Sequence, residues 1–315
     1  MSARAGSGRA GGQAGSGRAG GQQRAVGPAL AGVLAGALAV AACTAGDARP
    51  RATLPAAVTF EVEVAQARTD RVARIVQLQV RNTGPLDVTV TRARLTGTSV
   101  GGATDEGRVV EADRMRRLRV PLDATRCDGA PDADPGARVA LDVSTADGRA
   151  GTVVVTPTDE TDDLRRIRGE DCARAAVAAG LDVRLSDELT VREVDGDVVA
   201  DLTLLVRPVP GGPHVRLTAV RSTTLLRPPG ADVDWAVDVD SAAPPADGRV
   251  VLPVVPARCD LHAIAEDKRG TVLGLRTEVD GVPQPVFHVA ASDALRGALY
   301  EVVLAACGHP TGAGG

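Results

Sequence analysis

One short motif in this chain has the residue types and spacing of a catalytic nucleophile. Gly97, Ser99 and Gly101 fit the pattern G-x-S-x-G, in which a serine on a sharp strand-to-helix turn attacks a carbonyl carbon. This chemistry needs a helix directly after the turn, so that the serine is held exposed. The sequence after Gly101 is Gly-Ala-Thr-Asp-Glu-Gly, which predicts a loop instead. We therefore expect no catalytic role for Ser99.

The four histidines are the next candidates, because histidine serves both as a general base and as a metal ligand. They lie far apart in the sequence, and none belongs to a paired motif such as H-E-x-x-H. We expect neither a zinc site nor a catalytic triad at these positions, which are His214, His262, His288 and His309.

A row of aspartates could bind calcium, which prefers several oxygen ligands. Its members share one face of an expected strand and are Asp232, Asp234, Asp238 and Asp240. A solvated outer face, with Trp235 and the odd-numbered valines in the core, explains the same pattern with fewer assumptions. The acidic loop at 128–136 presents the same choice. Neither segment has EF-hand spacing, so we predict no bound metal or other cofactor.

Cys43 ends a segment with the features of a bacterial secretion signal. Residues 25–42 carry no charge, and four arginines and no acidic residue precede them. A basic start, an apolar middle and small residues before the cleavage site are typical of signal peptides. The order of residues 40–43, Val-Ala-Ala-Cys, resembles the lipobox of bacterial lipoproteins. This resemblance implies that residues 1–42 are removed and that Cys43 becomes a diacylated N-terminus.

Two alternatives to lipidation remain open at this stage. A retained transmembrane helix needs about 20 strongly apolar residues, whereas this run is rich in alanine and glycine and contains Pro28. Ordinary signal peptidase could instead cut after Ala41, because residues 39–41 also read A-x-A. That cut would leave Cys43 in a soluble product without a thiol partner. We favour the lipid anchor, since the other four cysteines pair without Cys43.

The composition narrows the class of partner. Removing residues 1–42 takes away four of the 36 basic residues and none of the 40 acidic ones, so the net charge falls from −4 to about −8. Such an acidic export product is a poor match for nucleic acid or anionic lipid headgroups. Aromatic residues make up 1% of the chain, which leaves few faces for stacking on sugars or bases. The excess of arginine over lysine resembles proteins of high-GC bacteria such as actinobacteria.

One segment of the chain recurs 132 residues later. Residues 118–128 align with residues 250–260, with proline, arginine, cysteine and aspartate at matching positions. A second cysteine, Cys172 or Cys307, follows each segment at a similar distance. We interpret the chain as two copies of one domain. The predicted organisation is a signal peptide with a Gly- and Arg-rich low-complexity start at 1–42, a tether at 43–55, modules at 56–176 and 177–308, and a disordered tail at 309–315.

Apolar and polar residues alternate within each copy, as at 58–64 and 76–81. This period of two is typical of half-buried antiparallel strands. Tight turns are predicted at the Asp-Gly pairs 147–148, 195–196, 247–248 and 280–281. About seven short strands in each copy describe a β-sandwich, so we expect a mostly β fold. The arrangement resembles tandem immunoglobulin-like or fibronectin-III-like modules, although the Cys…Trp…Cys pattern of antibody domains is absent.

Each copy ends in a helical signal and contains one pair of cysteines. Ser292 starts a stretch with apolar residues at helical spacing, and a weaker stretch after Thr161 is interrupted by Gly169. Four cysteines in an oxidising compartment allow three pairings. The repeat selects one disulfide in each copy, namely Cys127 with Cys172 and Cys259 with Cys307. We interpret both as structural, because no Cys-x-x-Cys redox motif exists.

Together these features favour a non-enzymatic lipoprotein, anchored outside the cytoplasm, that binds an envelope protein or a cell-wall partner. The alternative is a solute-binding lipoprotein with a ligand between the modules, although two-lobed receptors usually show βαβ patterns that this chain lacks. A cell-wall hydrolase is the third hypothesis. An enzyme or a receptor predicts a polar cluster facing a pocket, whereas a surface-binding module does not.

Overall fold

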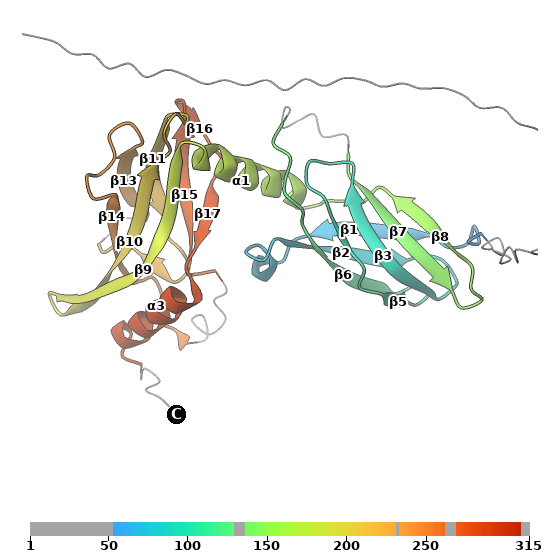
Figure 1. The fold of residues 1–315 in the computed structure, drawn as a ribbon. Coiled ribbons are helices and arrows are strands. Elements are labelled where there is room, and N and C mark those ends of the chain that lie inside the picture. The colour runs from blue at the N-terminus through green and yellow to red at the C-terminus, as the bar shows by residue number, and fades with distance from the viewer. Residues whose placement is uncertain (1–52, 129–135, 231–232, 262–268, 310–315) are drawn as a thin grey trace, which may run out of the picture. The chain divides into compact units, whose positions relative to one another are not determined.

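A computed structural model describes residues 53–128, 136–230, 233–261 and 269–309 of the chain (Figure 1). The signal peptide, Cys43 and all but the last residues of the predicted tether lie outside these ranges. So do His262, Asp232, most of the acidic loop and residues 310–315. No helix within the described ranges has the length and apolar character needed to cross a membrane.

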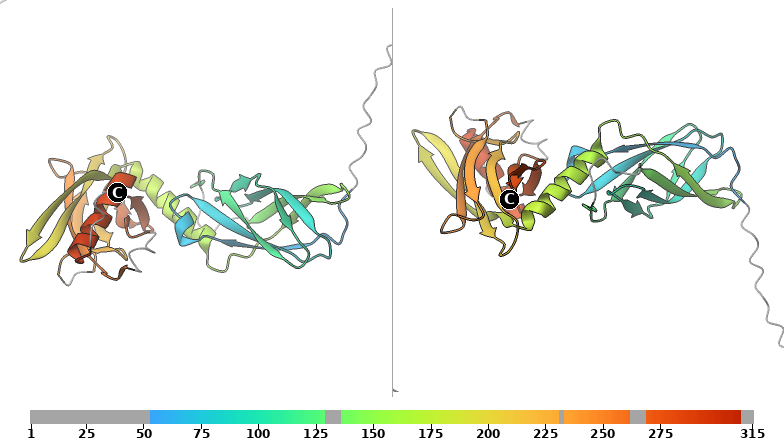
Figure 2. Two further views of the ribbon diagram at one scale, coloured as in Figure 1. Left: turned by 90° about the horizontal axis from the view of Figure 1, so that it is seen from below. Right: turned by 90° about the horizontal axis from the view of Figure 1, so that it is seen from above.

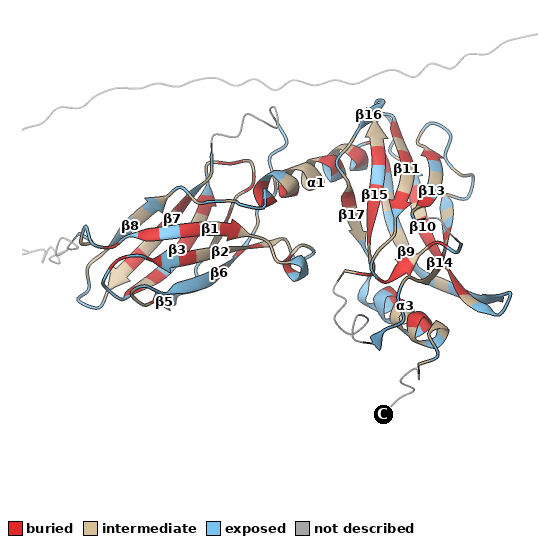
Figure 3. Ribbon diagram, turned by 180° about the vertical axis from the view of Figure 1, so that it is seen from behind, coloured by how far each residue is buried: buried red, intermediate tan, exposed pale blue. Residues whose placement is uncertain are grey.

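The first copy forms two antiparallel sheets. Its strands are β1 (Phe60–Ala65), β2 (Ile75–Asn82), β3 (Val88–Thr96), β4 (Gly102–Thr104), β5 (Arg108–Val110), β6 (Met115–Pro121), β7 (Arg138–Thr145) and β8 (Ala150–Val155), and a short 3-10 helix, η1 (Arg68–Asp70), precedes β2. One sheet has the order β1-β2-β6, and the other has the order β4-β3-β7-β8 with β5 also paired to β3. Buried and exposed positions alternate along these strands (Figure 3), as the sequence pattern predicts. The buried faces of both sheets contribute to one apolar core.

The second copy also has two antiparallel sheets. Its strands are β9 (Leu181–Val194), β10 (Asp197–Pro208), β11 (Val215–Arg221), β12 (Leu226–Arg227), β13 (Trp235–Asp240), β14 (Arg249–Pro256), β15 (Val272–Val279), β16 (Val282–Pro283) and β17 (Phe287–Ala290). One sheet has the order β12-β14-β10-β9, and the other has the order β13-β11-β15 with β16 and β17 both paired to β15. A second core, separate from the first, lies between them. The structure is therefore mostly β, and each copy has the two facing sheets of a sandwich.

The pairing of the strands reproduces the sequence repeat. The repeated segments begin on β6 and β14 and continue past the ends of these strands, and β6 pairs with β2 as β14 pairs with β10. Leu78 is opposite Leu118 in the first copy, and Leu204 is opposite Val250 in the second. The same face of each pair is buried, because both segments carry the same alternation.

The hairpin between β9 and β10 shows how the predicted turns form. Asp195 and Gly196 have φ angles of 53° and 88°, so both central residues adopt the left-handed conformation of a type I′ turn. Asp280 and Gly281 repeat this geometry at 49° and 78°, between β15 and β16. Two of the four predicted Asp-Gly turns are thus confirmed as type I′ turns, with both central residues in the left-handed conformation.

Two described α-helices follow the sandwiches, namely α1 (Asp163–Ala178) and α3 (Asp293–Ala306). The Oγ of Ser292 accepts a hydrogen bond of 3.1 Å from the backbone N–H of Leu295, so α3 begins where the sequence predicts. Helix α3 packs against β9, β10 and β14 (Figure 2). Its apolar residues Leu299 and Val303 are buried in the second core.

Helix α1 is longer than the sequence predicts, because it continues through Gly169. The carboxylate of Asp159 caps its start, accepting from the N–H groups of Asp163 and Leu164 at 2.8 and 2.9 Å. Leu164 belongs to the first core, whereas Ala173, two turns later, belongs to the second. Packing on both cores outweighs the weak helix propensity of glycine, which costs about 1 kcal/mol.

Both predicted disulfides form. Cys127 is bonded to Cys172, and Cys259 is bonded to Cys307. Each bridge joins the segment after a repeated strand to a helix, the first to α1 and the second to the end of α3. The interpretation of the chain as two separately folding domains stays a prediction, and a boundary after residue 176 would cut the last turn of α1.

Candidate functional site

A pocket of about 340 Å³ lies against α1. Its lining comes from the segment between β1 and β2, the residue after β6, the middle of α1, and residues at or near β15 and β17, so it draws on both copies of the repeat. Its charged or titratable residues within the described ranges are Arg71, Arg74, Arg174, Arg269, Glu170, Asp171 and His288. The remaining lining side chains are Gln66 and five apolar residues, Val72, Leu122, Ile167, Val272 and Ala290.

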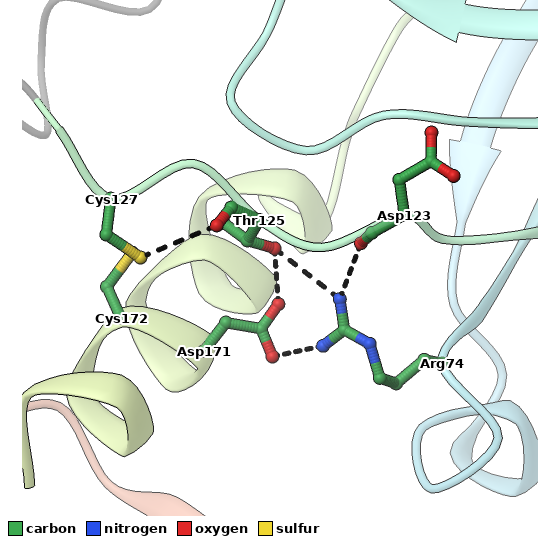
Figure 4. Close-up of a disulfide and its surroundings, with 6 residues drawn as sticks. All are labelled: Arg74, Asp123, Thr125, Cys127, Asp171 and Cys172. Carbon is green, nitrogen blue, oxygen red and sulfur yellow. Dashed lines mark hydrogen bonds and ion pairs between the residues drawn. A yellow bond between two sulfur atoms is a disulfide. The ribbon is translucent and has the colours of Figure 1, made fainter. Parts of the chain in front are cut away.

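The carboxylate of Asp171 joins one wall of the pocket to α1, next to the first disulfide (Figure 4). It accepts hydrogen bonds from the Oγ1 of Thr125 and from the guanidinium of Arg74. The same guanidinium also donates to the backbone carbonyl of Asp123 at 3.0 Å. Arg74 has a φ angle of 53°, a left-handed conformation that disfavours residues with a Cβ. The ion pair with Asp171 holds the segment of Arg74 beside α1. The disulfide to Cys172 holds the segment after β6 there.

A second network surrounds Glu170 on the neighbouring position of α1. One carboxylate oxygen of Glu170 accepts from Arg166 at 3.1 Å, and the other lies 3.6 Å from Nδ1 of His288 on β17. Arg166 also donates to Gln66 at 2.7 Å and to Asp163 at 2.6 Å. Burial raises the pKa of Glu170, but its interactions with His288 and Arg166 outweigh burial and lower the pKa below its usual range. Glu170 is therefore ionised and its charge is compensated.

Arg71 and Arg269 add positive charge to the lining, and burial disfavours the charged form of both guanidinium groups. Burial lowers the pKa of Arg71 and the nearby charge of Arg166 lowers it further, whereas the carboxylates of Glu170 and Asp163 act in the opposite direction. Burial likewise lowers the pKa of Arg269, followed by repulsion from Arg71. The Nε of Arg71 is buried and has no hydrogen-bond partner in the described part of the chain. The lining therefore combines charged groups of both signs with apolar side chains, and such a polar cluster is suited to binding a polar ligand.

The serine motif lies in a connection between two strands and not in a nucleophile elbow. Residues 97–101 connect β3 to β4, and a short strand follows Gly101 in place of the predicted loop. Arg126 holds this connection, since its guanidinium donates to the carbonyl of Thr98 at 2.7 Å and its backbone N–H donates to the carbonyl of Ser99 at 3.1 Å. The expectation of a loop was wrong because β4 pairs with β3, a contact between strands that the local sequence does not indicate.

The aspartate row pairs with basic side chains. Within the described ranges, Asp234 lies 3.4 Å from Arg276, Asp238 lies 3.0 Å from Arg216, and Asp240 lies 2.7 Å from His214. No group of three or more metal-ligating residues gathers in these ranges. Trp235 is buried and donates through its indole N–H to the carbonyl of Pro253 at 2.7 Å. Val233, expected on the core side, is instead 75% exposed, because it precedes the start of β13.

The histidines have different environments. His214 contacts Asp240 on the exposed face of β13, and the Nε2 of His309 lies 3.0 Å from the carbonyl of Cys259. His288 alone of the three described histidines lines the pocket, opposite Glu170. Sequence reasoning missed this pair and the arginines around it, since 118 residues separate Glu170 from His288 and no motif connects them.

Comparisons with known proteins give no assignment. No family model matches the chain, and no curated protein matches its sequence. Similar solved structures include red sea bream transglutaminase (TM-score 0.19, 12% identity, covering 76% of this chain) and an Amycolatopsis orientalis exo-chitosanase (TM-score 0.18, 14% identity, covering 73%). The matches span 32% of the transglutaminase and 26% of the chitosanase. The B domain of a biofilm-associated protein matches at a TM-score of 0.17 and 8% identity, over 77% of this chain and 88% of that domain. At these TM-scores the likenesses carry no argument.

Proposed function

We propose that this protein is a non-enzymatic binding protein, held at the outer face of the cytoplasmic membrane by a lipid on Cys43. The lipobox-like residues 40–43 support the anchor. Both disulfides support an oxidising compartment, because structural disulfides are rare in the reducing cytosol. Each copy of the repeat is a module of the immunoglobulin-like or fibronectin-III-like kind.

The observation that carries the binding role is the charged pocket beside α1. Of the two binding hypotheses, a pocket with a polar cluster favours a small solute over a partner bound only at the surface. Its volume of about 340 Å³ falls within the usual range for small-molecule sites. The lining residues from both copies are tied to α1 through Asp171 on one side and Glu170 on the other. A ligand in this pocket would contact α1 and residues from both copies of the repeat.

Methyl NMR spectra of the mature protein in neutral detergent test the binding site. Candidate solutes should shift the methyl signals of Ile167 and Val272, which line the pocket. The methyl groups of Val154, an exposed residue on β8, serve as the matched control. Filling the pocket with Val272→Trp should abolish the shifts. Ligand-induced shifts confined to outer surfaces such as that of Val154 would instead identify a surface-binding module.

The anchor is tested separately by replacing Cys43. The wild-type protein should partition into the detergent phase and carry a diacylated N-terminal cysteine by mass spectrometry. Cys43→Ala should accumulate as an uncleaved precursor. Normal processing of this variant to a soluble form would exclude lipidation while leaving the pocket untouched.

A further inference from the structure

The outer part of the β9–β10 hairpin extends beyond the sheet to which it belongs (Figure 1). Strand β14 pairs with β10 only from Ala200 onward, so residues 192–199 form a ribbon of two strands in the described part of the chain. Residues 190–194 of β9 are all exposed, and Val191 exposes 53% of its surface. A two-stranded hairpin is only marginally stable in water by itself. The ribbon would therefore gain stability from a further strand.

The outer edge of β9 can accept such a strand, because β9 pairs with β10 alone within the described ranges. Val194 and Asp197 flank the two-residue type I′ turn and form a hydrogen-bonded pair. Hydrogen-bonded and non-hydrogen-bonded pairs alternate from there along the hairpin. The backbone groups of the even-numbered residues at 190–194 therefore face β10, whereas those of Leu189 and Val191 face outward. Outward-facing N–H and C=O groups are a template for pairing with another chain.

The start of α3 limits this edge at one end. The Oγ of Ser292 donates to the carboxylate of Asp187 at 2.7 Å. The register of the hairpin also shifts at this point, between Leu202 and Leu204 of β10. A regular ladder along β9 can therefore begin at Glu188 and continue toward the turn.

The sequence of this edge is complementary to itself. A two-fold axis at Thr190 places β9 antiparallel to β9 of a second copy, with Leu189 opposite Val191 and Glu188 opposite Arg192. Both Leu189–Val191 pairs then have outward-facing backbone groups, so each pair can exchange two hydrogen bonds. Apolar and opposite-charge pairs across strands are stabilising. Moving the axis by one residue in either direction would leave the two charged residues without opposite charges facing them.

The ion pairs within each copy agree with this register. Arg192 donates to both carboxylate oxygens of Asp201, at 2.9 and 3.1 Å. Glu188 lies 3.2 Å from Arg249 on β14. Across the axis, the order would be Asp201 and Arg192 of one copy, followed by Glu188 and Arg249 of the other. Each charge would thus have neighbours of the opposite sign only.

We propose that two copies of this protein associate through β9, which joins their sheets into one antiparallel sheet across a two-fold axis at Thr190. The partner is a second copy because the edge matches itself in its hydrogen-bonding phase, its apolar pairs and its charges. This interface is separate from the pocket beside α1 and does not depend on the proposed solute or on the lipid anchor.

Sedimentation equilibrium of the mature protein in density-matched neutral detergent tests the association. The wild-type protein should form a reversible dimer. Val191→Pro removes an outward-facing N–H but no hydrogen bond to β10, and proline is tolerated at such edge positions. Since each copy loses one interfacial donor, the dimer Kd should rise about 10- to 100-fold. Val191→Thr is the matched control, because it keeps the N–H and the β-branched shape and should dimerise nearly as the wild type does.

A cysteine at Thr190 tests the register. Residues that face each other in a non-hydrogen-bonded pair have Cα atoms about 4.5 Å apart, which falls within the range of about 4.4–6.8 Å for disulfides. Under oxidising conditions Thr190→Cys should therefore form a disulfide between two copies, identified by non-reducing peptide mapping. Thr152→Cys, at an exposed position of β8, is the control and should not.

Three results would overturn the proposal. The first is a folded wild-type protein that stays monomeric throughout the concentration range, with its fold checked by circular dichroism. The second is equal dimerisation of Val191→Pro and Val191→Thr, and the third is equal crosslinking of Thr190→Cys and Thr152→Cys. Crosslinking of Thr190→Cys to a different envelope protein in cells, with the purified protein monomeric, would identify a foreign strand as the occupant and would also exclude the second copy.

Discussion

Removing the first disulfide should destabilise the first copy. The number of residues between the two cysteines determines the size of this loss of stability. Cys127 and Cys172 are 45 residues apart in the sequence. Closing a loop of this length lowers the entropy of the unfolded chain by about 13 cal/mol/K, or about 4 kcal/mol at 298 K. A typical domain has a free energy of unfolding of about 5–15 kcal/mol, so the variant Cys127→Ser/Cys172→Ser should lose a large part of its stability.

Urea unfolding followed by two signals makes this prediction specific to one copy. Trp235 is the only tryptophan and lies in the second core, so its fluorescence reports on the second copy, whereas circular dichroism reports on both. The midpoint seen by circular dichroism should fall for the first copy, with the fluorescence midpoint nearly unchanged. The matched variant Cys259→Ser/Cys307→Ser should lower the fluorescence midpoint instead. A loss below about 1 kcal/mol would refute the entropic reasoning, and an equal fall of the fluorescence midpoint in both variants would show that the copies unfold together.

Three further predictions concern α1, α3 and the boundary between the copies. Because interactions with His288 and Arg166 lower the pKa of Glu170 below its usual 4.5, ionised Glu170 stabilises the fold above that pH, and the contribution is lost as the pH falls through the lowered pKa. Glu170→Gln should therefore lose less stability than the wild type on acidification, measured by urea titrations at a series of falling pH values; an equal loss of unfolding free energy in both proteins would contradict this. Ser292→Ala should cost about 1 kcal/mol through loss of the cap on α3, and Ser292→Asp should restore it, both measured by thermal unfolding. A fragment of residues 163–309 should resist urea better than one of residues 177–309, which lacks the buried Ala173; equal midpoints would mean that α1 is dispensable for the second core.

The features that recur in the sequence could be predicted from it. The alternation of apolar residues specifies which face of each strand is buried, and the repeat with its four cysteines identifies both disulfides. Ser292 marks the start of α3 because its side chain provides a local hydrogen bond that a short window of sequence contains. These predictions succeed because each depends on local periodicity or on a comparison within the chain.

The pocket could not be predicted, because its residues are brought together only by tertiary packing. Arg71, Glu170 and Arg269 come from three distant segments, and none of these segments has a binding motif. Helix α1 was underestimated for the same reason. Gly169 interrupts its local signal, and the contacts that extend it are the cap at Asp159 and packing on both cores. In an arginine-rich sequence, the residue type alone does not indicate which arginines line a pocket after folding.

The most direct measurement of the central claim is the methyl NMR titration of the mature protein with candidate solutes. We predict that a bound solute shifts the methyl signals of Ile167 and Val272, which line the pocket beside α1, and leaves those of the exposed Val154 unchanged. Shifts confined to outer surfaces such as that of Val154, with Ile167 and Val272 unchanged at saturating concentration, would contradict the assignment of this pocket as the ligand site.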